Sequence, residues 1–572
     1  MNQTDNASSG APRLSNRRLP GRPGRARERV LRRARRSALY RKALGIFREW
    51  FPADPDHVPG SDDPAVARWM AAIQRTAWAL LLMALPVTSF PYFPPAMGGE
   101  ALVRPLSLYP LAILMLLAIL PLALRRPSPR TLLVLLPFVL IAAASSLLSL
   151  LRGIAPALGV TASARVLRGM FTLWIGCSFY LTIALLPQNR EDLRFSLRWI
   201  YAGMAAAMAW GSIQAFQLLT ANQPLLTLIA KVQRRVSIRK LNPERIVGLT
   251  YEPHWFAEQI ILLVIPWSLA AVLSGRSVFS WRWKWVSIEL LLLTWALLVL
   301  PFTYSRSGLV DLIILMIVSL VLFARPAALA DREPAQMQPG TARGLRQDSV
   351  RRLRRLVLAL PFMAVALAAV LAPAYLIGTR NAFFARLWEY WQHPGQAAAD
   401  RSGDRSLANY LSYLGLDARL VFAQTAYKTY QNYPLLGVGL GNYAFYFEEM
   451  LPYRSIGEIP EVMNMITPEV GRDRLITAKN LYLRILAETG IVGAAAFAAF
   501  IIANIGCALL LWKSPDPEWR YWGMASLCGL IAFSLSAMTF DSFVIPNMWV
   551  IFGLVSAAAH TYLRTYDRSH CS

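Results

Sequence analysis

Arginines stand beside two apolar segments of this chain and in one long polar stretch, and their chemistry predicts binding of an anion. Arg245 precedes the segment GLTYEPHWFAEQ, and Arg306 lies in the short sequence TYSRSG. Arg419 belongs to a long polar stretch that contains several further arginines. The planar guanidinium group donates two parallel hydrogen bonds to a phosphate and keeps its charge at any accessible pH. Several such arginines beside membrane spans therefore predict a site for a pyrophosphate or a phosphate-linked lipid.

Side chains that can hold or transfer a proton stand where apolar segments begin. Lys479 and Asn480 come directly before one apolar run, and Glu488 lies two turns inside it. Glu252 and His254 lie at the entry to another run. An ionisable side chain inside a membrane span is costly, so it usually marks a functional site or a paired group. These residues are therefore candidates for proton transfer or for support of a bound anion.

Three of the candidates also have a structural interpretation. Arg306 could anchor its helix by extending its charge to the membrane surface. Glu488 could pair with Arg484, which lies one turn earlier on the same helix face. His254 could be an interfacial residue without a role in proton transfer.

Glycines mark two further positions. Gly490 and Gly493 lack side chains, which predicts close approach of another helix at this point. The sequence GVGLGNY at 437–443 is not preceded by a strand. We therefore interpret its glycines as a turn before a helix rather than as a nucleotide-binding loop.

The remainder of the sequence predicts an all-α polytopic membrane protein. Of its 572 residues, 55% are hydrophobic and only 16% are charged. Runs of about 20 apolar residues, the length that crosses the hydrocarbon core of a bilayer, recur along it. We expect about twelve spans, at 76–93, 106–124, 131–151, 170–187, 198–220, 254–274, 284–302, 307–324, 355–378, 483–512, 519–540 and 544–563.

The distribution of charge predicts the topology. The net charge of +26 gathers in the N-terminal tail, in one internal loop and in short turns, which fits the positive-inside rule better than a nucleic-acid-binding face. The loop 221–253 breaks this pattern, because it is predicted to be external and yet contains the basic sequence KVQRRVSIRKLNPER. We expect its arginines to bind an anionic ligand. The predicted parts are a basic cytoplasmic tail without order at 1–70, spans 1–9 at 71–378, a large periplasmic loop at 379–480, spans 10–12 at 481–563 and a cytoplasmic tail at 564–572.

Neither a metal nor a cofactor is expected. The four cysteines and five histidines are scattered and show no metal-ligand spacing.

Four sequence motifs, taken together, resemble the O-antigen ligase and O-antigen polymerase superfamily of bacterial inner-membrane glycosyltransferases. The motifs are RxxGLxYEP at 245–253, TxSRSG at 303–308, Arg419 followed after 14 residues by PLLGVGLGNY, and KNLYLRILAETGIVG at 479–493. The resemblance implies a metal-independent transfer of a glycan from undecaprenyl diphosphate to an acceptor sugar hydroxyl at the periplasmic face. It also implies that Arg245, Arg306 and Arg419 hold the diphosphate.

One departure from the family pattern affects the expected mechanism. In the ligases a His-Asn pair stands where this chain has Lys479 and Asn480, and the histidine is the proposed base. Lysine is a poor base near neutral pH unless burial or neighbouring cations lower its pKa. We therefore expect Lys479 to hold the phosphate and Glu252 to act as the base, and the missing histidine favours the polymerase branch.

The sequence leaves alternative functions open. The first is an O-antigen ligase that transfers the glycan to lipid A–core, and the second is a transporter of lipid-linked sugar, although the two halves of the chain show no repeat. A non-catalytic scaffold would not need arginines from three separate segments. Expected partners are the lipid-linked glycan, the bilayer, and a chain-length regulator or flippase, but no nucleic acid.

Overall fold

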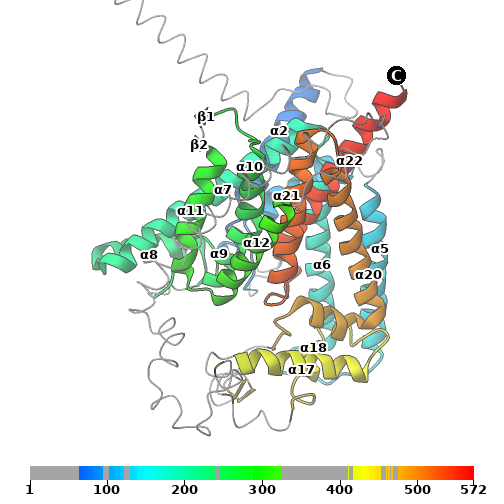
Figure 1. The fold of residues 1–572 in the computed structure, drawn as a ribbon. Helices are drawn as coiled ribbons and strands as arrows, with labels where there is room; N and C mark the ends of the chain where they lie inside the picture. Colours follow the sequence, from blue (N-terminus) through cyan, green and yellow to red (C-terminus); the bar gives the residue numbers. More distant parts are fainter. Residues whose placement is uncertain are drawn as a thin grey trace, which may run out of the picture. The chain divides into compact units, whose positions relative to one another are not determined.

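The computed structural model describes residues 64–93, 102–120, 129–239, 241, 244–284, 286–324, 410, 416–452, 459, 462–463, 466–467 and 475–571. Almost all regular structure within these residues is helical, which confirms the predicted helical class (Figure 1). One short antiparallel hairpin pairs β1 (Arg282–Trp283) with β2 (Val286–Ser287). Most of the predicted tail 1–70, about half of the predicted loop 379–480 and the whole predicted span 355–378 lie outside the described residues.

The helices follow one another through the described parts of the chain. They are α2 (Pro64–Met83), α3 (Leu108–Leu114), η3 (Met115–Ile119), α5 (Arg130–Leu150), α6 (Ala162–Leu185), α7 (Arg190–Thr220), α8 (Gln223–Val236), α9 (Pro253–Gln259), η4 (Ile260–Val264), α10 (Ile265–Ser274), α11 (Ile288–Val299), η5 (Leu300–Thr303), α12 (Arg306–Ala324), α17 (Leu416–Asn432), α18 (Tyr443–Tyr446), α20 (Leu481–Trp512), α21 (Pro517–Ser536) and α22 (Asn547–Cys571).

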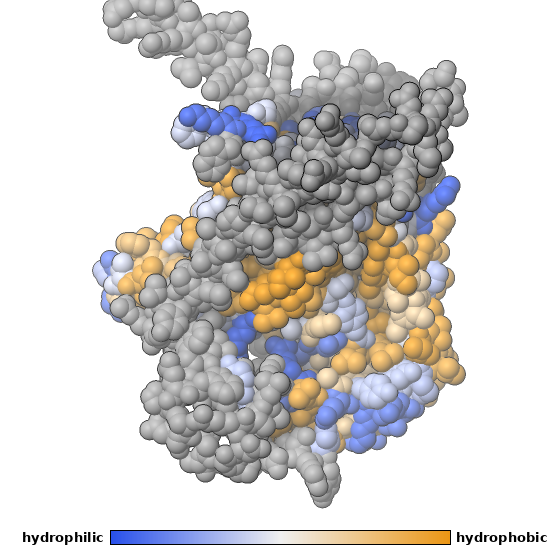
Figure 2. Space-filling view, viewed as in Figure 1, coloured by the Kyte–Doolittle hydropathy of each residue, from blue (hydrophilic) through white to orange (hydrophobic). Residues whose placement is uncertain are grey.

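Four of the described helices are long and apolar enough to cross a membrane. They are α5, α6, the continuous run α9–η4–α10, and α20. The runs α3–η3 and α11–η5 are apolar but shorter. Figure 2 shows hydrophobic surface across the middle of the visible face, with hydrophilic patches above and below it. These features support a membrane protein, while the number of twelve spans stays a prediction.

Asparagine side chains cap the N-terminal ends of two long helices. Asn189 accepts a hydrogen bond from the backbone N–H of Asp192 in α7, and Asn480 accepts one from Leu483 in α20. These bonds satisfy backbone donors that have no partner inside the helix. The sequence therefore sets where α7 and α20 begin.

A buried polar network joins the apolar helices of the core. Tyr180 Oη on α6 donates to Thr131 Oγ1 on α5 at 2.8 Å, and Thr131 donates to Ser556 Oγ on α22 at 2.9 Å. Ser556 in turn donates to Asn504 Oδ1 on α20 at 3.3 Å. Buried polar groups are costly when unpaired, so this network fixes the relative positions of four helices.

Helix α20 is kinked where a loop packs against it. Gly490 takes a left-handed φ of 64° inside the helix, and the backbone N–H of Val438 donates to the Ala487 carbonyl freed by the kink. A Cβ atom at Gly490 would clash with the carbonyl of Leu435. The close approach predicted at this glycine is therefore real, but the partner is the loop 434–441 and not another helix.

The glycine-rich sequence forms a turn before a helix, as predicted. Gly437, Gly439 and Gly441 all have positive φ values, of 67°, 91° and 81°, and α18 follows directly. A backbone with φ in this range favours glycine because other residues clash there.

Candidate functional site

Arg245, in the loop before α9, is held by the loop that precedes α12. Its Nε and Nη2 atoms donate to the carbonyl oxygens of Thr303 and Tyr304, each at 3.0 Å. Tyr304 has a left-handed φ of 49° and ends η5. Two separate sequence motifs thus form one structural unit, and this unit places Arg245 beside the start of α12 at Arg306.

The carboxylate of Glu252 lies between two basic side chains at the start of α9. Arg239 Nη1 is 2.6 Å from Oε1, and His254 Nδ1 is 2.9 Å from Oε2. Burial would raise the pKa of Glu252, but the hydrogen bond and charge of His254 and the pairing with Arg239 outweigh it and lower the pKa to about 2. Glu252 is therefore ionised at neutral pH and is a weak proton acceptor in this state.

The guanidinium groups around Arg245 create an excess of positive charge. Burial, together with the charges of Arg306 and Arg239, lowers the pKa of Arg245 to about 10, although the carboxylate of Glu252 opposes this shift. Arg245 remains protonated at neutral pH. We name Arg239, Arg245, Glu252, His254 and Arg306 the α9 cluster.

A second group of charged side chains surrounds the start of α20. The backbone N–H of Lys479 donates to Asp541 Oδ2 at 2.7 Å, and the residue takes a left-handed φ of 51°. Lys479 Nζ lies 4.8 Å from the centre of the Phe422 ring on α17. A cation over an aromatic face is stabilised in its charged form, so this contact favours a protonated Lys479.

Glu488 is paired with the arginine one turn before it. Arg484 Nε donates to Glu488 Oε2 at 3.0 Å, and Arg484 also donates to the backbone carbonyl of Asp541. The backbone N–H of Gly441 is a further donor to Glu488. The pairing that the sequence left open is thus present, and it links α20 with two loops. We name Lys479, Asn480, Arg484, Glu488 and Asp541 the α20 cluster.

Two arginines from neighbouring segments bind the glycine-rich loop beside this cluster. Arg165 Nε donates to the Gly441 carbonyl at 3.0 Å, and Arg152 Nη1 donates to the Gly437 carbonyl at 2.8 Å. The guanidinium of Arg152 also lies over the ring of Tyr433, 4.8 Å from its centre. The loop is therefore fixed at both ends, and it cannot move without breaking these contacts.

The end of α21 connects the two clusters. Ser536 Oγ donates to Asp311 Oδ2 on α12 at 3.4 Å. The next residue, Ala537, accepts a hydrogen bond from the backbone N–H of Leu481 at 2.8 Å. Because α12 begins in the α9 cluster and α20 begins in the α20 cluster, both clusters lie at the same end of the helices.

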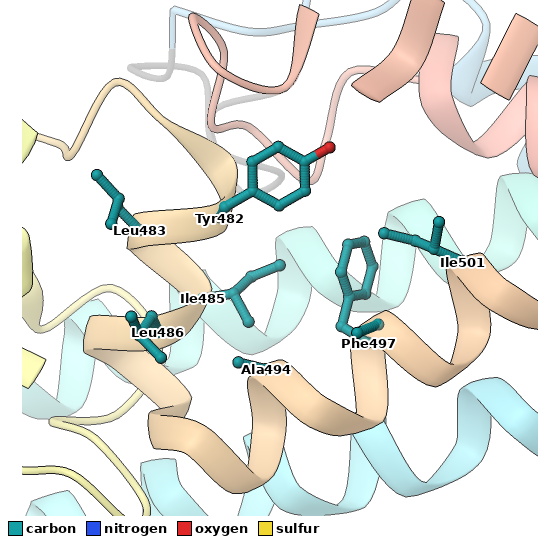
Figure 3. Close-up of a pocket in the computed structure, with 8 residues that line it drawn as sticks. Tyr482, Leu483, Ile485, Leu486, Ala494, Phe497 and Ile501 are labelled. Atoms are coloured by element: carbon teal, nitrogen blue, oxygen red, sulfur yellow. The ribbon is translucent and has the colours of Figure 1, made fainter. Parts of the chain in front are cut away.

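An open apolar groove of about 230 Å³ lies along the kink of α20. Figure 3 shows that its lining comes from the two limbs of that helix, on either side of the kink. The lining residues are Tyr482, Leu483, Ile485, Leu486, Ala494, Phe497, Ala498 and Ile501. The first lining residue, Tyr482, follows Lys479 by three residues, so one end of the groove lies near the α20 cluster.

The structure groups most of the predicted site residues but not all of them. Arg245, Arg306, Glu252 and His254 come together in the α9 cluster, and Lys479, Asn480 and Glu488 come together in the α20 cluster. Arg419 is exposed on α17, and no described contact joins it to either cluster. Among the described residues, no group of three His, Cys, Asp or Glu side chains is arranged to hold a metal ion.

The sequence did not single out three charged residues: Asp541 and Arg239, which belong to these clusters, and Arg165, which lies beside the α20 cluster. Asp541 lies in the short turn between α21 and α22, and Arg165 lies at the start of α6. Arg239 lies between α8 and the motif at 245–253. The sequence shows that these charged residues lie at the ends of apolar segments. Only the fold shows which of these ends lie close together.

A comparison with known protein families gave a match to part of the chain. Residues 290–498 match the family model described as O-antigen ligase. The match supports membership of the O-antigen ligase and polymerase family. It covers α12, α17 and the first part of α20, so Arg306 and the start of the α20 cluster lie inside it, whereas Arg245 and Glu252 precede it. A comparison with curated proteins gave no match.

This family implies a lipid-linked glycan as substrate and a membrane environment. The two charged clusters at one end of the apolar helices are compatible with both, because the sugar and diphosphate of such a substrate are polar and its lipid is not. A function of the O-antigen ligase type is therefore supported for this chain.

Proposed function

We propose that this protein is an inner-membrane polymerase of undecaprenyl-diphosphate-linked oligosaccharide repeat units, in O-antigen or exopolysaccharide synthesis. The growing glycan on its carrier is the donor, and a sugar hydroxyl of an incoming lipid-linked repeat unit is the acceptor. Both charged clusters face the periplasm. The N- and C-termini are cytoplasmic, and a chain-length regulator or flippase acts beside the enzyme.

The observation that carries this proposal is the α9 cluster. Arg245 is fixed by two carbonyl groups, and the charges of Arg239 and Arg306 lie near it. Three guanidinium groups outnumber the two carboxylates near them, Glu252 and Glu244, so net positive charge remains at a membrane boundary, which suits a diphosphate. Arg419 is assigned to the diphosphate on family resemblance alone.

In the proposed reaction the acceptor hydroxyl oxygen attacks the anomeric carbon of the donor sugar. A carbon–oxygen bond forms there, and the bond between this carbon and the diphosphate oxygen breaks. The diphosphate leaves with the electron pair and stays on the lipid, stabilised by the arginines and by the protonated Lys479. The proton of the hydroxyl passes to a base on the protein.

We propose that the pair Glu252 and His254 provides this base. Glu252 alone is a weak base while it is paired with Arg239. Its carboxylate instead orients the His254 ring through Nδ1, so that Nε2 can accept the proton when the ring is neutral. A histidine oriented by a carboxylate is a common general base, and this arrangement compensates for the lysine at position 479.

The test is a reconstituted reaction with a defined undecaprenyl-diphosphate repeat unit. Purified protein in liposomes should produce a ladder of longer lipid-linked glycans without added lipid A–core. A protein that leaves the repeat unit unchanged but transfers it to lipid A–core would be a ligase, which is the alternative that the family match also allows. Movement of the repeat unit across the bilayer without elongation would indicate a transporter.

A further inference from the structure

Helix α8 leaves the bundle sideways just before the α9 cluster. Ala221 takes a left-handed φ of 51° at the end of α7, and Asn222 then caps α8 by accepting a hydrogen bond from Leu225 N–H at 3.0 Å. Figure 1 shows α8 running across the direction of α6 and α20. A helix in this orientation lies along a membrane surface when the other helices cross the membrane.

The inward face of α8 is fixed to α7. Ile229 and Gln233 are buried, and Gln233 Oε1 accepts hydrogen bonds from Trp210 Nε1 at 2.8 Å and from Gln214 Nε2 at 3.2 Å. Gln214 also accepts from the backbone N–H groups of Val247 and Gly248. The rotation of α8 about its own axis is therefore set by contacts on one side only.

The opposite face carries three exposed cations. At about 100° per residue, Lys231, Arg234 and Arg235 fall within one arc of the helix, opposite Ile229. All three are exposed, and within the described part of the chain none forms an ion pair. Leu228, beside this arc, is 56% exposed. The helix is thus apolar on one side and cationic on the other, with part of its apolar side uncovered by protein.

The helix dipole explains only part of this charge. Arg234 and Arg235 lie in the last turn, where cations interact favourably with the carbonyl end of a helix. Lys231 lies before that turn. These charges also stand in the one loop that breaks the positive-inside pattern of the sequence, so they call for an anionic partner on that face.

The end of α8 is anchored beside the candidate site. Ser237 Oγ, at the C-cap, is hydrogen-bonded to Ser89 Oγ at 2.7 Å, and the backbone N–H of Ile238 donates to the Ser89 carbonyl at 3.1 Å. Arg239 then pairs with Glu252. The cations of α8 are therefore held at a fixed position next to the α9 cluster.

We propose that α8 is a binding site for anionic phospholipids, in which Lys231, Arg234 and Arg235 contact the phosphodiester groups. The uncovered apolar side around Leu228 enters the acyl-chain region, as in other amphipathic helices at membrane surfaces. Charge complementarity selects anionic headgroups over zwitterionic ones. This site would concentrate negatively charged lipids beside the α9 cluster, whichever glycosyl transfer occurs there.

The experiment measures lipid selectivity and not glycan synthesis. The purified full-length protein is reconstituted in phosphatidylcholine membranes with trace spin-labelled phosphatidylglycerol or phosphatidylcholine, and the relative association constant of the two lipids is determined. The test variant is K231Q/R234Q/R235Q. The matched control K231R/R234K/R235K keeps the three charges at the same positions.

We expect the wild type and the charge-conserving variant to prefer phosphatidylglycerol about fivefold or more, and the glutamine variant to lose most of this preference. The single variant Lys231→Gln, outside the last turn, should lower the preference without affecting folding and serves if the triple variant is unstable. Unchanged selectivity in a folded glutamine variant would overturn the proposal. So would selectivity for the lipid-linked diphosphate carrier with none for phosphatidylglycerol, measured with the unlabelled carrier as competitor.

Discussion

Replacement of Lys479 separates a phosphate-binding role from a role as base. The side chain lies over Phe422 and its backbone is fixed by Asp541, so a substitution here changes the ammonium group without displacing the start of α20. Loss of a charge-assisted contact costs about 1.5–3 kcal/mol. At 1.36 kcal/mol for each factor of ten, Lys479→Gln should lower kcat/KM by roughly tenfold to 150-fold.

The conservative variants identify the role. Lys479→Arg keeps the positive charge and can still lie over Phe422, so it should keep appreciable activity, whereas Lys479→His should keep little at neutral pH. The assay is elongation of a defined lipid-linked repeat unit between pH 6 and 9. Lys479→Gly is the backbone control, because glycine accepts the left-handed φ of 51° without strain. An active histidine variant beside an inactive arginine variant would refute this reasoning and make Lys479 the base.

Other predictions follow from the same contacts. Arg245→Lys should lose at least one of the bonds to Thr303 and Tyr304 and reduce elongation about tenfold or more, and full activity would remove Arg245 from the site. Gly490→Ala should lower the melting temperature through its clash with Leu435, whereas Gly506→Ala, where a Cβ meets nothing within 4 Å, should not; equal melting temperatures would contradict the described kink. Because the pKa of Glu252 is lowered from 4.5 to about 2, its ion pairs contribute stability above about pH 4.5 that is lost as the pH falls toward 2. Glu252→Gln should therefore remove this part of the acid dependence of the melting temperature, and an identical pH profile would show that the pairing contributes nothing.

The sequence predicted the local arrangement at α20 better than the assembly around it. Lys479 and Asn480 stand at the start of a helix as expected, because the asparagine caps it and the apolar run begins at Leu481. The pairing of Glu488 with Arg484 was also predictable, since residues four apart share a helix face. Such features depend on neighbours in the chain.

The remaining contacts depend on segments far apart in the chain. Nothing in the sequence around Asp541 indicates that it meets Lys479, or that Arg239 pairs with Glu252. The role of Gly490 was predicted in part, because its lack of a side chain signals close approach but not whether a helix or a loop approaches. Arg419 was grouped with the other arginines through its motif, and its place on α17 leaves that grouping a prediction.

The glycan phenotype of a deletion strain tests the central claim most directly. If the protein polymerises lipid-linked repeat units, the strain should carry single repeat units on lipid A–core, or should lose its high-molecular-weight exopolysaccharide. A plasmid copy of the wild type should restore the polymer, whereas one with Arg306→Ala should not. Long glycan that remains on undecaprenyl diphosphate in the deletion strain would contradict the claim and identify the protein as the ligase.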